Sequence, residues 1–148
     1  MTAETDWLME LNPKEFAKSL VQKTDEAWLL EFTRSLDRHR ARDDFDRFLA
    51  VWNLSQQAAA GLFKISRQAI GKWRTRGVPK EHLEAVATLS AATDLLVRSL
   101  KRDRIPAVVR RPSARLGGQS LLDLVGAGRT HEVLIACREM FDFGHVHM

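Results

Sequence analysis

The chain has 148 residues, of which 45% are hydrophobic and 28% charged, so it is long and apolar enough for one ordinary domain or two small ones. No uninterrupted apolar run approaches the roughly 20 residues of a membrane span, and the acidic N-terminus lacks the basic start of a secretion signal. A single cysteine, Cys137, excludes an intrachain disulfide framework and suits a reducing compartment. We therefore expect a cytoplasmic protein without membrane contact, in which Cys137 is a buried structural thiol.

The net charge of +4 is modest, but the charges are unevenly distributed. Residues 1–53 contain eight basic and eleven acidic residues, and residues 81–148 contain nine basic and eight acidic ones. Residues 54–80 contain six basic residues and no acidic residue. A basic island between acidic and near-neutral flanks favours one local face that binds a polyanion.

The first 53 residues are predicted to be helical. One helix begins at Asn12-Pro13, and a second begins near Thr24. The apolar stripe of the second helix consists of Trp28, Leu29, Phe32 and Leu36. The polar run at residues 37–44 either continues that helix in solvent or breaks it, and the helical period resumes from Phe45 to Trp52.

Two short helices joined by a tight turn are predicted within residues 54–79. Ser55 and Ser66 stand at N-cap positions, where a hydroxyl accepts a hydrogen bond from a backbone N–H one turn on. Ile70 and Trp73 share one face of the second helix, so Trp73 is expected to pack inward and not to stack on bases. This pattern is a helix-turn-helix, whose second helix enters the DNA major groove. An ordinary helical hairpin would share the spacing, but the concentration of cations favours DNA.

The exposed positions of this segment supply the candidate DNA contacts. Arginine and glutamine bond the edges of guanine and adenine, whereas cations elsewhere hold phosphates and fix the register. The candidate base-reading residues are Ser66, Arg67, Gln68 and Lys72. The candidate phosphate-binding residues are Gln56, Gln57, Lys64, Arg74 and Arg76.

A long helix is predicted over about residues 81–100, and the cations at its end complement the helix dipole. The pattern then becomes less regular, and residues 107–109 carry the strongest strand signal in the chain. Ser120 caps a short helix, and a last helix begins at Arg129 or Thr130. The inward face of the last helix consists of Val133, Leu134, Cys137 and Phe141.

The sequence contains no recognisable catalytic arrangement. It has no phosphate-cradling glycine loop and no Ser/His/Asp or Cys/His set, so we expect neither enzyme activity nor a cofactor. His145 and His147 are spaced two residues apart, but only Asp142 stands near them as a further ligand, so we expect no metal site.

Two segments resemble known families. Residues 54–79, with SRQAIGKW at the second helix, resemble the Xre/Cro-type helix-turn-helix of bacterial and phage repressors. Residues 115–134, RLGGQSLLDLVGAGRTHEVL, resemble the toxin-binding domain of the Xre/MbcA/ParS antitoxins, which has an lgG-x-(S/T)-P-l-d-L turn and helix, a glycine step and a final helix. The resemblance covers about residues 45–144. The chain departs from it at Leu121, where the family has proline, at Lys64, where repressors often have glycine, and in lacking the family's Trp-Leu before the domain.

The resemblance implies an antitoxin of a type II toxin-antitoxin system. Members of this family bind a RES-domain toxin, an NAD-consuming enzyme, cover its active site, and repress their own operon through the helix-turn-helix. The inhibitory contact would come from residues 117–148, whose deletion should abolish neutralisation and leave operator binding. The candidate toxin-binding residues are Leu116, Gly117, Gly118, Asp123, Arg129, Phe141, Phe143, His145 and His147.

The sequence thus predicts an all-α protein in three parts, an N-terminal helical extension (1–42), a helix-turn-helix domain with its following long helix (43–104) and a C-terminal toxin-binding domain (105–148). The aromatic side chains of the extension either pack on the core, the default interpretation, or form a dimer surface. The expected partners are a double-stranded DNA operator, a cognate RES-type toxin and a second copy of the chain, because one helix-turn-helix reads only a half-site. The alternatives are a stand-alone or phage-type repressor whose C-terminal half dimerises, and an interaction module that no longer binds DNA.

Overall fold

The computed structural model describes residues 13–15, 17–18 and 26–146, without the side chains of residues 142–146. Within these residues every regular element is helical, apart from one isolated antiparallel bridge between Ser113 and Gln119. The prediction of an all-α fold is therefore confirmed. None of the described helices is long and apolar enough to cross a membrane.

The chain divides into two compact units, residues 1–36 and residues 37–148. Helix α3 (Glu26–Trp52) begins in the first unit and ends in the second. Because α3 is continuous through the polar run at residues 37–44, that run extends the helix and does not break it. The predicted helix starts at Asn12 and Thr24 lie outside the described residues.

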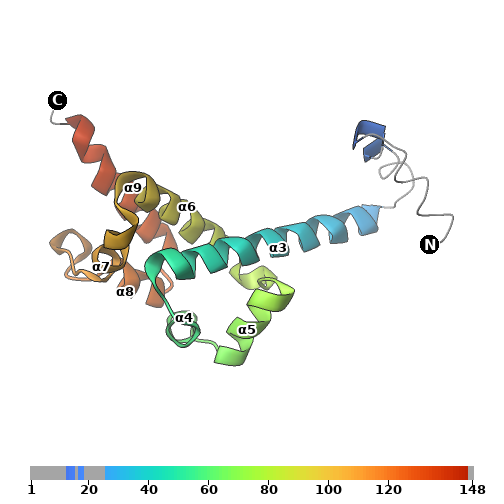
Figure 1. The fold of residues 1–148 in the computed structure, drawn as a ribbon, viewed down its shortest axis with the longest axis horizontal. Coiled ribbons are helices and arrows are strands. Elements are labelled where there is room, and N and C mark those ends of the chain that lie inside the picture. The colour runs from blue at the N-terminus through green and yellow to red at the C-terminus, as the bar shows by residue number, and fades with distance from the viewer. Residues whose placement is uncertain (1–12, 16, 19–25, 147–148) are drawn as a thin grey trace. The chain divides into compact units, whose positions relative to one another are not determined.

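Two short helices, α4 (Gln56–Phe63) and α5 (Arg67–Arg76), follow α3 and are joined by a tight turn (Figure 1). The Ser55 hydroxyl accepts a hydrogen bond from the backbone N–H of Ala58 at 3.0 Å, and the Ser66 hydroxyl accepts one from Ala69 at 3.1 Å. Both predicted N-caps are confirmed, and each satisfies one of the N–H groups that a helix start leaves without a partner.

Lys64 ends α4 in the left-handed conformation, with φ 56° and ψ 42°. This conformation brings a Cβ close to the following carbonyl and costs about 1–2 kcal/mol for a residue other than glycine. We expect Lys64→Gly to raise the free energy of unfolding by a few tenths to about 1 kcal/mol, since glycine loses part of this gain through its greater freedom in the unfolded chain. Urea denaturation measures the difference. Lys64→Ala, which keeps the Cβ, is the control, and a glycine variant less stable than the alanine variant would contradict the explanation.

Helix α5 packs on α3 and α4 through aromatic rings. Trp73 is 3% exposed, and its ring centroid lies 5.2 Å from that of Phe45 on α3 and 5.5 Å from that of Phe63 on α4. Ile70, three residues before Trp73, is fully buried. The Ile70 and Trp73 face of α5 is therefore its packing face, as predicted, and Trp73 is not available for stacking on bases.

The residue that follows α5, Gly77, lies against the backbone of α3. Its φ is 98°, and a Cβ at this position would lie 3.0 Å from the Cβ of Arg38. The next N–H, that of Val78, donates to the Arg38 carbonyl at 3.4 Å. Glycine here ends α5 and also permits the close approach that fixes α5 against α3.

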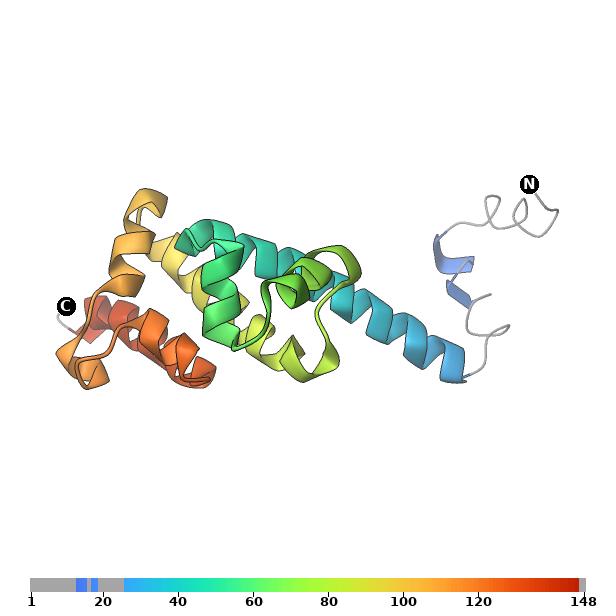
Figure 2. The same cartoon turned by 90° about the horizontal axis from the view of Figure 1, so that it is seen from below.

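The C-terminal half packs around two long helices. Helix α6 (Leu83–Ser99) lies along α9 (Thr130–Val146), as Figures 1 and 2 show. Between them in sequence, α7 (Ile105–Arg110) contacts α8 (Leu121–Gly126), and α8 contacts both α4 and α9. The short 3-10 turns are η1 (Lys80–His82), η2 (Arg102–Arg104) and η3 (Ala114–Leu116).

Residues 107–109, which carry the strongest strand signal of the sequence, are helical and lie in α7. Pro106 occupies the first turn of that helix, where its missing N–H costs no intrahelical hydrogen bond. Ile105 and Val109, four residues apart, are both fully buried and form one helical face. The strand signal at residues 107–109 was therefore misleading, because Pro106 stands at the start of a helix, whereas residues 111–120 are less regular, as expected.

Residues 117–148 contribute to the core of the second unit. Leu121, Leu124 and Val133 are each at most 2% exposed, and α9 covers much of α6. Deleting these residues would expose the apolar faces of α6 and α4 to water, at a cost of roughly 1.5–3 kcal/mol per large side chain. Such a deletion would unfold the unit, so single surface substitutions are the better test of a C-terminal function.

Cys137 lies in α9 and is fully buried, as predicted. Burial raises the pKa of its thiol to about 12, so the thiol stays neutral across the neutral and mildly alkaline range. We expect a thiol reagent to label Cys137 only after the protein unfolds. Mass spectrometry of protein treated with and without urea measures this, and rapid labelling of the native protein would contradict the burial.

Candidate functional site

The exposed face of α5 carries most of the predicted DNA-binding side chains. Arg67, Gln68 and Lys72 are exposed, whereas Ile70 and Trp73 of the same helix are buried. Among the described residues, no ion pair joins Arg67 or Lys72 to an acid. The exposed members of the predicted set are Gln57, Lys64, Ser66, Arg67, Gln68, Lys72, Arg74 and Arg76.

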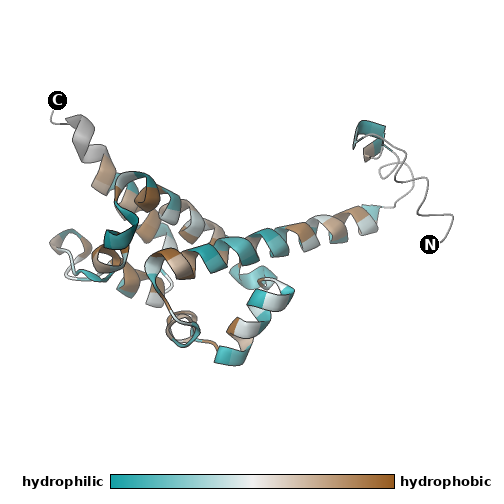
Figure 3. Ribbon diagram, viewed as in Figure 1, coloured by the Kyte–Doolittle hydropathy of each residue, from teal (hydrophilic) through white to brown (hydrophobic). Residues whose placement is uncertain are grey.

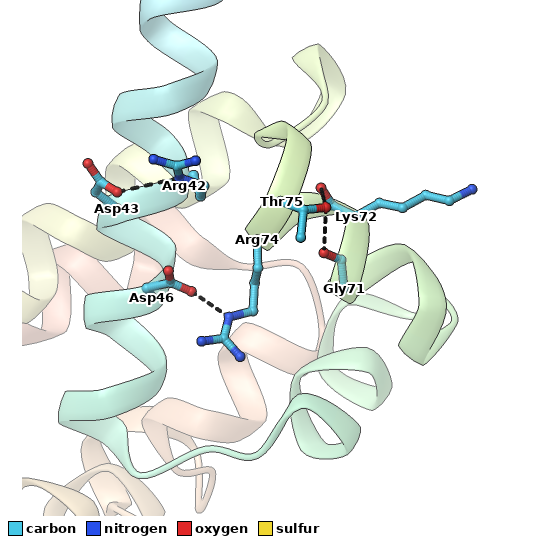
Figure 4. A network of polar contacts seen from close by, with 7 residues as sticks. All are labelled: Arg42, Asp43, Asp46, Gly71, Lys72, Arg74 and Thr75. Atoms are coloured by element: carbon cyan, nitrogen blue, oxygen red, sulfur yellow. Dashed lines mark hydrogen bonds and ion pairs between the residues drawn. The ribbon is translucent and has the colours of Figure 1, made fainter.

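Arg74 is paired with an acidic residue of α3. Its Nε donates to Oδ1 of Asp46 at 2.8 Å, and Figure 4 shows its side chain directed toward α3. Lys72, two residues earlier, points away from α3 in the same view. The ion pair offsets one of the six positive charges within residues 54–80. Fewer cations are therefore left to bind DNA than the number of basic residues indicates.

Two further predicted residues, Gln56 and Ser66, have contacts within the chain. Gln56 is half-buried and lines a hollow of about 330 Å³ together with Asp46 and Arg74. The Ser66 hydroxyl already accepts the capping hydrogen bond of α5, which leaves its O–H and one lone pair for a base. The structure therefore brings Gln56 and Arg74 together at one edge of the pair, and Ser66 and Arg67 together at the start of α5.

Three of the predicted toxin-binding residues, Leu116, Gly117 and Gly118, lie in one tight turn before α8. The N–H of Ser113 donates to the Gln119 carbonyl at 3.0 Å, and the N–H of Gly118 donates back to the Ser113 carbonyl at 2.9 Å. Gly117 and Gly118 have φ angles of 68° and 84°, which favour glycine, and both are exposed. The turn therefore presents its backbone to solvent at a fixed position.

Asp123 and Arg129, also predicted to contact a toxin, have partners within the chain. Asp123 accepts a hydrogen bond from the N–H of Ser120 at 2.9 Å and Ser120 accepts one from Asp123 at 3.0 Å, which is a capping box. Arg129 donates to both carboxylate oxygens of Glu132 and to the side-chain oxygen of Gln119 at 3.0 Å. The hydrogen bonds with Glu132 raise the pKa of Arg129, and the same bonds lower the pKa of Glu132. Both residues therefore order the turn and the two helices that follow it.

A largely apolar groove of about 300 Å³ lies beside this turn and is lined by residues of α7, α8 and α9. Leu116 lines it, and so does Met140 of α9, which is 39% exposed. The charged side chains in its lining are Arg111, Arg115 and Glu139. Apart from Leu116, none of these residues was predicted, because the groove forms only where segments distant in sequence meet.

The remaining predicted contacts lie at the end of α9. Phe141 is half-buried and packs against the core, as predicted. The side chains of Phe143 and His145 and the whole of His147 lie outside the described residues. In the part of the chain that is described, no three His, Cys, Asp or Glu side chains lie close enough together to hold a metal ion.

Arg110 of α7 links the C-terminal half to the end of α3. Its Nη1 donates to the carbonyl of Trp52 at 2.9 Å and to that of Pro106 at 2.8 Å, and its Nη2 donates to the carbonyl of Asn53 at 2.9 Å. Asn53 follows α3 directly and has a φ of 56°. The bonds fix α7 relative to the end of α3. No sequence signal indicated this contact, since Asn53 and Trp52 stand 57 and 58 residues before Arg110.

Comparison with known proteins supplies an informative likeness. No protein-family model matches the sequence, and no curated protein matches it. A chain in the crystal structure of the M. tuberculosis MbcT-MbcA toxin-antitoxin complex has a similar fold, with a TM-score of 0.55 and 19% sequence identity. The match covers 67% of the present chain and 91% of that chain. The present chain therefore shares its fold with most of the chain from that complex.

Proposed function

We propose that this protein is an antitoxin, which binds and inhibits a cognate toxin through its C-terminal half and represses its own operon by binding DNA. The observation that carries the proposal is the shared fold, which spans 91% of a chain from a toxin-antitoxin complex. The resemblance of residues 115–134 to the toxin-binding domain of the Xre/MbcA/ParS antitoxins supports the same function from the sequence. On that resemblance, the cognate toxin is a RES-type enzyme that consumes NAD.

The DNA-binding part of the proposal assigns the α4–α5 pair as a helix-turn-helix. It is supported by the two serine-capped helices, by the buried Ile70 and Trp73, and by the exposed Arg67, Gln68 and Lys72 of α5. A helix that presents cations and amides in this way fits the major groove, where these groups bond base edges and phosphates.

The toxin-binding part assigns the glycine turn and the groove beside it as the contact surface. The turn offers exposed backbone groups at Gly117 and Gly118, and the groove offers a mostly apolar cavity that includes the half-exposed Met140. Apolar cavities with a few fixed polar groups at their edge are the usual anchors of protein interfaces.

Single substitutions on α9 test the toxin-binding part. Met140→Glu places a charge in the groove and is expected to abolish rescue of growth when the chain is co-expressed with its proposed cognate toxin. Ile135→Glu is the matched control, because Ile135 is 50% exposed on the same helix but does not line the groove.

The Met140 variant is expected to keep its helical content and its affinity for the operator. Loss of rescue in both variants would contradict the assignment of the groove, as would rescue by the Met140 variant at wild-type level. A chain that binds its operator but forms no complex with the neighbouring gene product would instead favour a stand-alone repressor.

A further inference from the structure

A second run of basic residues lies between the end of α6 and the glycine turn. Residues 98–115 contain seven basic residues and one acidic residue, so the run has a net charge of +6. The other residues of the segment 81–148 contain two basic and seven acidic residues, and the near-neutral total of that segment therefore conceals the run. The basic side chains are all exposed, namely Arg98, Lys101, Arg102, Arg104, Arg110, Arg111 and Arg115.

Several of these residues already have a role within the fold. Arg98 lies in the last turn of α6, where a cation complements the helix dipole. Arg110 bonds backbone carbonyls at the end of α3 and within α7, and Arg115 also has an interaction within the chain. The dipole effect is confined to the last turn of a helix, so it does not account for Arg104 or Arg111.

Arg104 and Arg111 lie on the side of α7 that lines the groove. They stand seven residues apart, which at about 100° per residue is within about 20° of two full helical turns. Val108 lies between them on this side, and both Val108 and Arg111 line the groove. Figure 3 shows α7 as a largely hydrophobic segment with hydrophilic residues next to it. The two arginines therefore stand at the edge of an apolar surface.

Acidic side chains of the chain do not neutralise these two arginines. No ion pair or side-chain hydrogen bond joins Arg104 or Arg111 to another described residue. Glu139 of α9 also lines the groove, but it forms no ion pair within the described part of the chain. The groove is therefore largely apolar in its lining and positive along the edge that α7 forms.

An apolar groove with a positive edge matches an acidic protein surface better than it matches DNA. A protein interface has an apolar centre and a polar edge, so an apolar side chain of the partner fills the groove while carboxylates meet the arginines. A DNA duplex offers phosphates to the arginines but no comparable side chain to the groove, and Glu139 would repel those phosphates. Figures 1 and 2 both show α7 and α5 on opposite sides of α4, so α7 also lies away from the proposed DNA-reading helix.

We propose that Arg104 and Arg111 attract an acidic surface of the partner protein to the groove, where an apolar side chain of that surface docks. This inference rests on the proposed antitoxin function, in which the partner is the cognate toxin. Charges at the edge of an interface act mainly on the rate of association. The two arginines therefore speed the capture of the toxin, and salt weakens their effect because it screens exposed charges.

The rate of association between the full chain and the purified RES-type toxin, measured by stopped flow at several salt concentrations, tests the inference. Arg104→Glu with Arg111→Glu is expected to slow association about tenfold in about 50 mM salt and by no more than about threefold in about 0.5 M salt. Arg104→Gln with Arg111→Gln removes the charges without reversing them, so its rate should be intermediate. Glu139→Gln is expected to raise the rate about twofold, because it removes a negative charge from the same groove.

Arg40→Glu with Lys80→Glu is the matched control. Both residues are exposed, neither lines the groove, and the change in net charge is the same as in the glutamate variant of Arg104 and Arg111. We expect the control to associate within about threefold of the wild type in about 50 mM salt. Circular dichroism confirms that each variant keeps its helical content, and operator affinity of the Arg104 and Arg111 variants is expected to stay within a few-fold of the wild type.

Several results would overturn the inference while the proposed function stands, because the chain would still bind the toxin. These are a wild-type rate that does not fall as salt rises, a wild-type rate in the glutamate variant of Arg104 and Arg111, and an equal loss in the control. Loss of operator affinity in that variant, with its association with the toxin unchanged, would show that the arginines bind phosphate and would also overturn the inference. If the wild-type chain forms no complex with the toxin, the proposed function and this inference both fail.

Discussion

Replacing Trp73 by alanine is expected to lower the free energy of unfolding by about 3–5 kcal/mol, a large share of the roughly 5–15 kcal/mol of a typical domain. Trp73 is 3% exposed and contacts rings on three different elements. Its ring centroid lies 5.2 Å from Phe45, 5.5 Å from Phe63 and 4.6 Å from His82. The alanine variant leaves a cavity where α3, α4 and η1 meet, so DNA binding should fall together with stability. Urea denaturation followed by circular dichroism measures the loss.

Trp28→Ala provides the matched control for this change. The same atoms are removed, but Trp28 is 43% exposed, so we expect a loss of no more than about 1 kcal/mol. Similar losses in the two variants would show that Trp73 does not hold the α4–α5 pair together.

Reversing two charges on α5, Arg67→Glu together with Lys72→Glu, is expected to weaken operator binding about 100-fold or more. Both side chains are exposed on α5, and both are without an acidic partner among the described residues. Gel shift or fluorescence anisotropy at several salt concentrations measures the affinity.

A control variant separates the loss of the α5 contacts from the change in net charge. Arg98→Glu with Lys101→Glu makes the same change in charge at the exposed end of α6. We expect this variant to bind the operator within a few-fold of the wild type, since long-range charge effects are screened at physiological salt. Equal losses in the two double variants would contradict the assignment of α5 as the DNA-reading helix.

Single substitutions on α5 distinguish residues that contact bases from residues that contact phosphates. Arg67→Ala or Gln68→Ala is expected to relax the preference for the operator sequence, because these side chains stand at the exposed start of α5. Arg76→Ala is expected to weaken binding to all sequences and to lower the slope of log affinity against log salt by about one. A variant of Arg76 that changes sequence preference would reverse these roles.

The local features of the fold were predictable because they depend on neighbouring residues. Ser55 and Ser66 are caps, Trp73 is buried, and Gly77 ends α5, and each of these follows from side chains within one helical turn. Position 64 was recognised in the same way, as a turn residue for which glycine is the natural choice.

Other features were missed because their causes lie far away in the sequence. Pro106 begins α7 and does not end a helix, and the choice depends on burial of Ile105 and Val109 against other elements. Arg110 bonds carbonyls at the end of α3, 57 and 58 residues earlier. The groove requires the glycine turn and Met140 to meet in space. The spacing of hydrophobic residues within one helix contains no information about contacts between distant segments.

The activity of the proposed cognate RES-type toxin provides the most direct test of the proposed function. The purified chain is titrated into the purified toxin while the consumption of NAD is followed. We expect consumption to stop when the chain reaches a stoichiometric ratio to the toxin, and we expect the two proteins to elute as one complex. Undiminished consumption of NAD in the presence of excess chain, with the two proteins eluting separately, would contradict the proposal that this protein is an antitoxin.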